Sequence, residues 1–360
     1  MILAAKVKLL PSPEQSIVLR STMEATNAAC NWVSEQAWEH KTFHRYSLHH
    51  LVYYEVRKRF SLPSRLTLEI IAKVADAYKL DQRACRNFRP HGAIGYLDGS
   101  LRWYNKKDEV SILTIDGRQH IPFICGHRQR ELLATRKGAS RLALADGKFY
   151  LIACCAIETP EVDEVEDFLG VDLGIVNIAT DSDGTNYSGG HLNGLRYRHR
   201  QLRQRLQKKG TKSARRLLKH RRRKESRFAA DVNHCISKKI VATAKDTKRG
   251  IALEELKGIR DRLTVRSGQR ATFSSWAFAQ LRSFITYKAA LVGLPVATVD
   301  PRNTSRTCPA CGYIDKRNRK SRATFLCLSC GHSGPADVIG AVNIGRSAGT
   351  GQPYAVGIVA

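Results

Sequence analysis

Four cysteines near the C-terminal end of the chain are spaced like the ligands of a structural metal ion. Cys308 and Cys311 form one Cys-x-x-Cys pair, and Cys327 and Cys330 form a second pair after 15 intervening residues. Two tight turns that each supply two thiolates are typical of a zinc ribbon, in which one Zn²⁺ ion is fully coordinated. We therefore predict a structural zinc site rather than a redox pair or a catalytic zinc. His332 lies nearby, but four cysteines already complete the coordination shell.

Three carboxylates stand where strands or helices are expected to begin or end. Asp172 lies in the apolar run FLGVDLG, Glu254 follows the apolar run IAL, and Asp337 precedes a small, apolar, helix-favouring run just after the second cysteine pair. Alone, Asp172 would be read as a turn residue at the end of a strand. An acid at the end of a buried strand is costly, however, unless it binds a cation. Glu255, one residue after Glu254, is expected to point to the opposite face of its strand.

If these three acids converge, they form a site for divalent cations. About three negative charges in one place fold stably only around positive charge, and two Mg²⁺ ions about 3.5–4 Å apart would supply it, with Mn²⁺ as a possible replacement. Such a pair activates a water molecule and stabilises the leaving oxygen of a phosphodiester. The candidate catalytic and metal-binding residues are therefore Asp172, Glu254 and Asp337.

The charge of the chain indicates its partners. Sixty Lys and Arg oppose 32 Asp and Glu, for a formal net charge of +28. We favour nucleic acid over a membrane surface, because no apolar run approaches the ~18 residues needed to span a bilayer. The N-terminal MILAAKVKLL is too short for a signal peptide, and the six cysteines outside the two pairs are scattered. We therefore expect reduced thiols and a cytoplasmic location.

One stretch, residues 196–224, contains 15 Lys or Arg and no acid. Leucines recur in it at helical spacing, which predicts one or two helices broken near Gly210. A run of charge is usually a solvated face, but cations without counter-charges repel one another unless a polyanion lies nearby, so we favour phosphate binding. The predicted nucleic-acid-binding residues are Arg196, Arg198, Arg200, Arg203, Arg205, Lys208, Lys209, Lys212, Arg215, Arg216, Lys219, Arg221, Arg222 and Arg223.

The N-terminal part is predicted to be helical after one strand at 2–9. Ser12 and Pro13 are typical of a helix start, with a capping box completed by Gln15, and two more helical stretches follow around 47–60 and 64–86. Several aromatic side chains lie in these helices, and we interpret them as core residues rather than as base-stacking residues. They are Trp32, Trp38, Tyr53 and Tyr54.

Short β-rich runs then follow, from about 89 to 158. Asp-Gly turns separate them at 98–99, 116–117 and 146–147, which predicts a series of hairpins. We expect a small antiparallel barrel that the first strand of the chain completes. The acidic segment at 158–168 is a predicted boundary.

The motifs of the chain, taken in order, resemble one family. KVKLLPSPEQ, LPSRL, KVADAYK, GVDLGIVNIAT, DVNHCISKKIV, ALEELKGI, YKAALVGLPV, DPRNTSRTCPACG, FLCLSCG and ADVIGAVNI are similar to segments of TnpB-type (OrfB-like) proteins. These are transposon-encoded, RNA-guided DNA endonucleases similar to the compact type V CRISPR effectors. The resemblance covers nearly the whole chain, and its specificity comes from the order and number of the motifs.

The resemblance implies an α/β nuclease domain of the RuvC-like, RNase H fold, with Asp172, Glu254 and Asp337 as metal ligands and an inserted zinc ribbon. It also implies an N-terminal antiparallel β-barrel with a helical insertion, which grips a guide RNA paired with its double-stranded DNA target and reads a short flanking motif. The implied divisions are 1–10 with 89–160 for the barrel, 11–88 for the helical insertion, 165–307 with 331–345 for the nuclease domain, 308–330 for the ribbon, and 346–360 for a loosely ordered tail.

The last acid lies in a departure from the family pattern Asp-x-Asn-Ala-Ala-x-Asn-Ile. Ile339 replaces the first Asn and Gly340 replaces one Ala, whereas Asp337 and Asn343 are retained. We expect metal ligation to survive with weaker support around the ligands. A non-catalytic RNA-guided repressor, a transposase that performs strand transfer and a stand-alone CRISPR effector stay open as alternatives.

Overall fold

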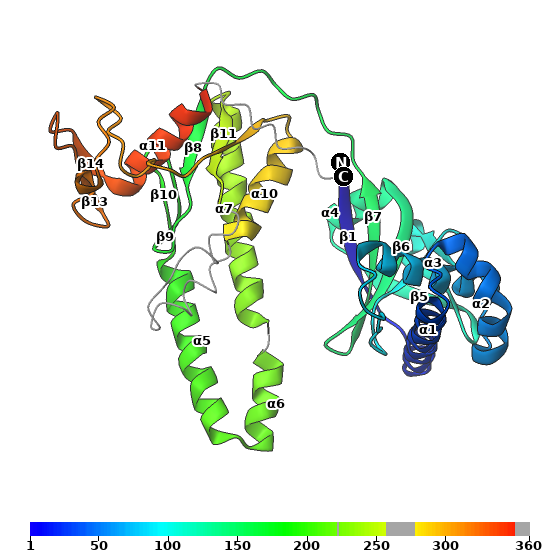
Figure 1. Cartoon of the computed structure of the whole chain (residues 1–360). Coiled ribbons are helices and arrows are strands. Elements are labelled where there is room, and N and C mark those ends of the chain that lie inside the picture. Colours follow the sequence, from blue (N-terminus) through cyan, green and yellow to red (C-terminus); the bar gives the residue numbers. More distant parts are fainter. Residues whose placement is uncertain (222, 257–277, 350–360) are drawn as a thin grey trace. The chain divides into compact units, whose positions relative to one another are not determined.

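The computed structural model describes residues 1–221, 223–256 and 278–349. The chain forms two compact units, of which the first is Met1–Glu158 and the second begins at Thr159 (Figure 1). Arg222, residues 257–277 and residues 350–360 lie outside the described residues. The amphipathic pattern of residues 272–294 predicts a helix, whose first six residues lie outside the described ones, as does most of the predicted tail.

Three helices follow the first strand of the first unit. They are α1 (Pro13–Glu39), α2 (Arg45–Phe60) and α3 (Ser64–Leu80). The predicted capping box is confirmed, because the backbone N–H of Gln15 donates to the Ser12 hydroxyl and the Gln15 side chain accepts from the Ser12 N–H. The prediction that the third helix reaches residue 86 is wrong. The carbonyl of Asp81 accepts a hydrogen bond from the Arg86 guanidinium instead of continuing the helix.

The core interpretation of the aromatic residues holds for three of them and is wrong for Tyr54. Trp32, Trp38 and Tyr53 pack against the core of the first unit, whereas 79% of Tyr54 is exposed. The reason is that α2 buries one narrow stripe with a spacing of four residues, so Tyr54 falls on the opposite face. This stripe consists of Leu48, Val52 and Val56.

A seven-stranded antiparallel sheet completes the first unit, in the order β2-β6-β7-β1-β5-β4-β3. The first strand lies in its centre and pairs with β7 and β5. Because β2 and β3 stand at opposite ends of the order but are separated by residues 97–100 alone, the sheet curls until it is nearly closed. The strands are β1 (Ile2–Leu9), β2 (Ile94–Tyr96), β3 (Leu101–Tyr104), β4 (Glu109–Thr114), β5 (Gly117–Ile124), β6 (Arg136–Ala145) and β7 (Lys148–Ala156), with α4 (His127–Ala134) between β5 and β6.

The second unit is built on a five-stranded mixed sheet in the order β10-β9-β8-β11-β12. The central strand β8 pairs in parallel with β11, which pairs in parallel with β12, whereas β9 is antiparallel to both β8 and β10. The strands are β8 (Phe168–Asp172), β9 (Asn177–Asp181), β10 (Asn186–Ser188), β11 (Gly250–Glu254) and β12 (Val296–Val299).

Helices cover both faces of this sheet. Leu169 and Val171 of β8 pack into a core with α7 (Lys224–Asp246) and α10 (Phe278–Ala290). The alternate residue Gly170 faces α11 (Ala336–Gly349), which contacts β8, β9, β11 and β12. This last helix continues to Gly349, beyond the predicted end of the nuclease domain at 345.

The basic stretch forms a helical hairpin in the second unit. It consists of α5 (Gly190–Lys209) and α6 (Lys212–Arg221), which extend from the sheet in Figure 1. The predicted break is confirmed at Gly210, whose φ of 62° ends α5 in the left-handed region. Among the helices of the described residues, none is long and apolar enough to cross a membrane.

The helix α11 crosses β8 at backbone distance. A Cβ atom added to Gly170 would lie 1.9 Å from the carbonyl oxygen of Ala341 and 2.4 Å from the backbone nitrogen of Gly345. No side chain fits between the two backbones, so glycine at 170 determines how closely the helix approaches the sheet.

We predict that Gly170→Ala lowers the free energy of unfolding by at least about 3 kcal/mol, because the methyl group would force α11 off the sheet. The matched control is Gly194→Ala on α5, where an added Cβ meets no atom within 4 Å. Alanine in this helix should stabilise the protein by roughly 0.5–1 kcal/mol. Urea unfolding of both variants measures the difference, and equal stability of the two would contradict the close crossing.

Candidate metal centres

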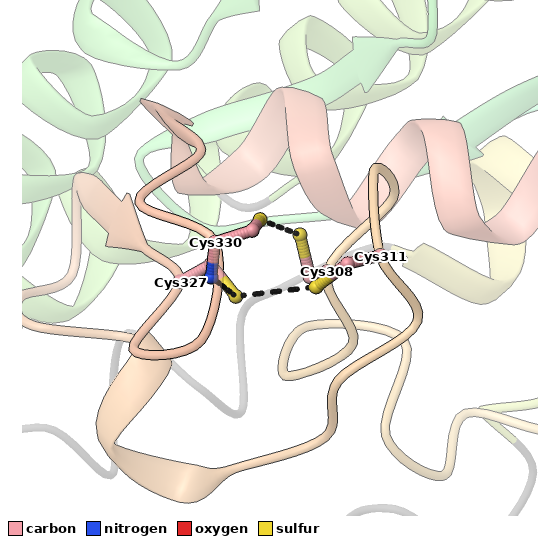
Figure 2. A group of neighbouring side chains, drawn as sticks. All are labelled: Cys308, Cys311, Cys327 and Cys330. Carbon is pink, nitrogen blue, oxygen red and sulfur yellow. Dashed lines mark hydrogen bonds between the residues drawn. The ribbon is translucent and has the colours of Figure 1, made fainter.

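The four predicted cysteine ligands meet in one cluster, which Figure 2 shows. Their four sulfur atoms all lie within 4.8 Å of one another. The Cys308 and Cys330 sulfurs are 3.6 Å apart, and so are those of Cys311 and Cys327. Disulfide sulfurs are only ~2.05 Å apart, whereas a tetrahedral site with Zn–S bonds of ~2.3 Å places them about 3.8 Å apart. The geometry fits one four-coordinate metal ion, and all ten cysteines are free thiols.

Two equivalent turns form this cluster. In each, the glycine after the second cysteine donates its N–H to the carbonyl of the first, from Gly312 to Cys308 and from Gly331 to Cys327. Both glycines have positive φ, of 76° and 73°. The buried Asn318 links the turns, because its side chain donates to the Tyr313 carbonyl and accepts from the backbone N–H of Leu328. Among the described residues, the group of four ligand atoms consists of the cysteines and does not include His332.

The cysteine cluster shares a small core with the start of α11. Phe325, Ala336 and Ile339 are buried together with Cys308 and Cys327. The isoleucine that departs from the family pattern therefore packs α11 against the ribbon.

A retained residue of the pattern adds a second link on the same side of the helix. The buried Asn343 side chain donates hydrogen bonds of 2.7 and 2.8 Å to the carbonyls of Thr304 and Thr307, just before the first cysteine. The ribbon thus holds the helix that carries Asp337.

Strand alternation places the other two acids on the face of the sheet that α11 covers. Along β8, Gly170 faces α11, so Asp172, two residues later, shares its face. Along β11, Ala252 packs with Ile344 of α11, and Glu254 follows two residues later. The two strands are adjacent and parallel, and their acids occupy matching C-terminal ends.

Asp337 lies in the first turn of α11, above these strand ends. A Cβ atom at Gly340, one turn further along, would lie 3.5 Å from the Asp172 carboxylate oxygen. The structure therefore brings the three predicted acids together, and residue 340 of α11 lies directly beside the Asp172 carboxylate.

The negative charges of the neighbouring acids act on Asp172. Burial, and after it the negative charges of Glu254 and Asp337, raise the pKa of Asp172 to about 7. Burial also raises the pKa of Glu254, although the hydrogen bond from Thr304 and the charge of Arg319 oppose that rise. A buried acidic group with such pKa values is short of positive charge, which is the condition that a bound cation relieves.

Three neighbouring side chains contact the acids, and the sequence analysis did not identify them. The Thr304 hydroxyl donates a 2.6 Å hydrogen bond to Glu254, and the Asn177 amide donates one of 3.1 Å to Asp337. Arg319, from the ribbon, forms a 3.4 Å ion pair with Asp337. The nearest sequence signal was their position in the motifs GVDLGIVNIAT and DPRNTSRTC and in the basic loop between the cysteine pairs.

Glu255 has a different role from Glu254. Both of its carboxylate oxygens accept hydrogen bonds from the Arg282 guanidinium on α10, at 2.7 and 3.2 Å. The same guanidinium donates to the Thr298 hydroxyl on β12. Glu255 therefore joins α10 to the sheet, while Glu254 belongs to the acidic site.

The oxygens of the three acids are less tightly gathered than the cysteine sulfurs. Within the described residues, the four cysteines are the one group of three or more ligand atoms all within 4.8 Å. The three acids therefore do not form a single set of ligand atoms as tightly gathered as that of the cysteines.

The predicted basic residues lie on the surface of α5, α6 and the turn into α7. Eleven of the fourteen are exposed, and Arg196 and Arg221 are half-buried, whereas Arg222 lies outside the described residues. The exposed ones are Arg198, Arg200, Arg203, Arg205, Lys208, Lys209, Lys212, Arg215, Arg216, Lys219 and Arg223.

Two family models match the chain. Residues 152–257 match the probable transposase family OrfB_IS605, and residues 278–344 match the Cas12f1-like TNB domain. In these two segments the chain is similar to the OrfB_IS605 and Cas12f1-like families. The first match contains two of the acids, and the second contains the third acid together with the four cysteines.

Curated relatives agree with these matches. The chain is 30% identical over 204 residues to the CRISPR-associated endodeoxyribonuclease Cas12f1 of Syntrophomonas palmitatica. This match covers 52% of this chain and 40% of the relative. It is 33% identical to the TnpB-like protein MJ0751 of Methanocaldococcus jannaschii, over 34% of this chain and 43% of the relative. It is 27% identical to the putative RNA-guided DNA endonuclease InsQ of Escherichia coli, over 55% of this chain and 53% of the relative. The matches thus span about half or less of each relative.

Solved structures show the same fold. A Cas12f1–sgRNA–target DNA complex matches with a TM-score of 0.62 at 15% identity, over 92% of this chain and 83% of that one. The mini-RNA-guided endonuclease CRISPR-Cas phi3 matches with a TM-score of 0.61 at 12% identity, over 98% of this chain and 93% of that one. Both units of the chain therefore have counterparts in these proteins.

We predict that Cys308→Ser removes the ion from the ribbon and destabilises the start of α11, because structural metal binding contributes directly to folding. The control is Cys154→Ser, which changes an exposed thiol outside the cluster. Elemental analysis for zinc and thermal unfolding measure both effects. A full zinc content and an unchanged melting temperature in Cys308→Ser would show that the cluster has no structural role.

We predict that the protein without added Mg²⁺ or Mn²⁺ loses stability as pH rises from about 4 to about 7. The raised pKa of Asp172 means that the folded state binds this proton more tightly than the unfolded state, so stability is greatest while Asp172 is protonated. Asp172→Asn should reduce this slope, leaving the contribution of Glu254, and stabilise the protein at pH 8 by a few kcal/mol, as an order of magnitude. Urea unfolding from pH 4 to 8 measures it, and identical slopes for both proteins would contradict the pKa shift.

Proposed function

We propose that the protein is an RNA-guided DNA endonuclease associated with a mobile element. Its catalytic site, formed by Asp172, Glu254 and Asp337, would cleave phosphodiester bonds of DNA. The observation that carries this proposal is the meeting of three acids from β8, β11 and α11 on one face of the sheet. The fold and the relatives favour the same reading, since curated relatives are named as endodeoxyribonucleases.

The proposed nuclease domain is RuvC-like, of the RNase H fold, and comprises residues 165–307 and 331–345 with the ribbon 308–330 inserted. Its support is the mixed sheet with β8 in the centre and helices on both faces. The proposed barrel domain comprises 1–10 and 89–160, and the helical insertion comprises 11–88. The central place of β1 in the first sheet favours this division, since the chain must leave that sheet after β1 and return to it at β2.

Asp172, Glu254 and Asp337 would hold the catalytic Mg²⁺, for which Mn²⁺ would substitute, and the cysteine cluster would hold Zn²⁺. The divalent ions, when bound, would activate water and stabilise the leaving oxygen. The other side chains orient the ligands. Thr304 fixes one oxygen of Glu254, and Asn177 fixes one oxygen of Asp337. Asp172 must give up its proton to bind a cation, and the charge of that cation would in turn lower the raised pKa of Asp172.

The proposed partners are a guide RNA and a double-stranded DNA target with a short flanking motif. The net charge of +28 and the exposed cations of α5 and α6 favour polyanionic partners. The structural match is to a complex with a single guide RNA and target DNA. With such partners, base pairing would supply most of the sequence specificity and the protein would hold backbone and shape. Such a protein would act in the prokaryotic cytoplasm.

We predict that Asp172→Ala, Glu254→Gln and Asp337→Ala each reduce Mg²⁺-dependent cleavage by roughly 10³-fold or more, because each removes a ligand for the catalytic ions. Binding of nucleic acid should persist, since the basic helices are unchanged. The matched control is Glu255→Gln, which neutralises the neighbouring acid outside the site and should retain cleavage.

The assay uses the protein purified with its copurifying RNA and a plasmid library that carries the guide-matched target beside randomised bases. Depletion of one flanking motif by the wild type, absent with Asp172→Ala, is the expected result. Cutting by any of the three variants at the wild-type rate would overturn the assignment. Bound RNA without cutting by the wild type would instead establish a repressor, and joined DNA ends would establish a transposase.

A further inference from the structure

The basic helices enclose a cleft in addition to their exposed outer surface. It lies between α5, α6 and the start of α7, with Gln280 of α10 at one side, and its volume is about 750 Å³. That volume is in the range of small-molecule sites, and it is larger than the contact of one phosphate with surface lysines requires. The cleft therefore has room for a whole nucleotide.

The walls of the cleft combine apolar and cationic side chains. Leu202 and Leu206 of α5 face it, together with Leu218 of α6. Cations surround these leucines, and Glu225 is the one carboxylate among the described lining residues. The lining cations are Arg196, Arg203, Lys219, Arg221 and Arg223. An apolar wall with a cationic rim matches a group that has a flat apolar face and a negative charge.

Ion pairs and a hydrogen bond hold the cleft in shape. The carboxylate of Glu225 accepts a 2.9 Å hydrogen bond from Arg203 and lies 3.9 Å from Arg196, whose side chain is 11% exposed. Across the hairpin, the Arg221 guanidinium lies 3.4 Å from the His199 ring. Burial and the charge of Arg221 lower the pKa of His199, which favours the neutral ring. These contacts join residues 22 or more positions apart and fix α5 relative to the end of α6.

A base-paired duplex does not fit this combination. A duplex presents phosphates to a protein surface and keeps its base faces stacked inside, so the three leucines would find no partner. An unpaired nucleotide exposes a base face that the leucines can cover, while its phosphates remain near the arginines. The chemistry of the cleft thus selects a single-stranded segment.

We propose that the cleft between α5, α6 and α7 receives one unpaired nucleotide of the bound nucleic acid, with its base against Leu202, Leu206 and Leu218. This inference rests on the proposed function for its nucleic-acid partner. It adds a site where one base leaves the stack of its neighbours, next to the outer surface of α5 and α6 that would bind phosphates. The strand is RNA or DNA, which share the chemistry that the cleft recognises.

The test uses two single-stranded oligonucleotides of one sequence, one RNA and one DNA, each with a single 2-aminopurine. The fluorescence of this base rises when it leaves the stack of its neighbours. We expect a rise when the full-length protein binds at least one of the strands, and no rise with the same label in a duplex. A rise with RNA assigns the site to the guide, and a rise with DNA assigns it to the substrate strand.

Two leucines on neighbouring positions of α6 provide the matched variants. Leu218 lines the cleft, whereas Leu217 is 41% exposed and does not. Leu218→Gln should abolish the fluorescence rise and weaken binding of the strand ~5-fold or more. Leu217→Gln should keep the rise and change affinity by less than about twofold. Arg205→Ala, on the outer surface, should weaken binding and reduce its salt dependence while the rise remains.

Two outcomes would overturn the proposal: no rise with either strand, or equal rises in the Leu217→Gln and Leu218→Gln proteins. If Leu218→Gln fails to fold by circular dichroism, Leu206→Gln on the opposite helix provides the same test. The measurement needs no Mg²⁺, and Asp172→Ala protein should give the full rise. A failure of the nuclease proposal and a failure of the cleft proposal are therefore seen separately.

Discussion

The geometry of the acidic site depends on the backbone contact between α11 and β8 at Gly170. A helix that meets a strand this closely has a fixed height above the sheet, so its first turn lies over the strand end that carries Asp172. The residues of α11 closest to Gly170 are Ala341 and Gly345, which are correspondingly small, whereas Ile344 packs against Ala252 of β11. Ile339 and Asn343, by contrast, contact the ribbon and the segment before it. The helix is thus held from two sides, by the sheet and by the cysteine cluster.

Packing and electrostatics oppose each other in this site. Apolar contacts and the ribbon bring the acids together, although their mutual repulsion and burial raise the pKa of Asp172 to about 7. One cation of the chain, Arg319, offsets part of this cost from the ribbon side. Gathering buried acids lowers the stability of the protein, and a cation that completes the site would offset this loss. The thiol cluster is the opposite case, because its sulfurs already lie at the spacing of a bound ion.

Local signals allowed much of the fold to be predicted, and contacts between distant residues account for the rest. The capping box at Ser12, the break at Gly210 and the two cysteine turns each depend on a few adjacent residues. The strand ends at Asp172 and Glu254 were recognisable from apolar runs, and strand alternation then decides which face they share. The contacts of Asn177, Thr304 and Arg319 with the acids join residues 18 to 160 positions apart. Ile339, which the pattern analysis treated as lost support, is a packing residue whose role depends on a neighbouring domain.

The central claim is that sheet and ribbon together build a site for two divalent cations. Its most direct test is anomalous diffraction from crystals of the protein grown with Mn²⁺. We predict two manganese peaks about 3.5–4 Å apart, bounded by the carboxylates of Asp172, Glu254 and Asp337. The same crystals should show one zinc peak among the four cysteine sulfurs. Manganese bound elsewhere, or no manganese at the three acids while zinc is present in the ribbon, would contradict the account.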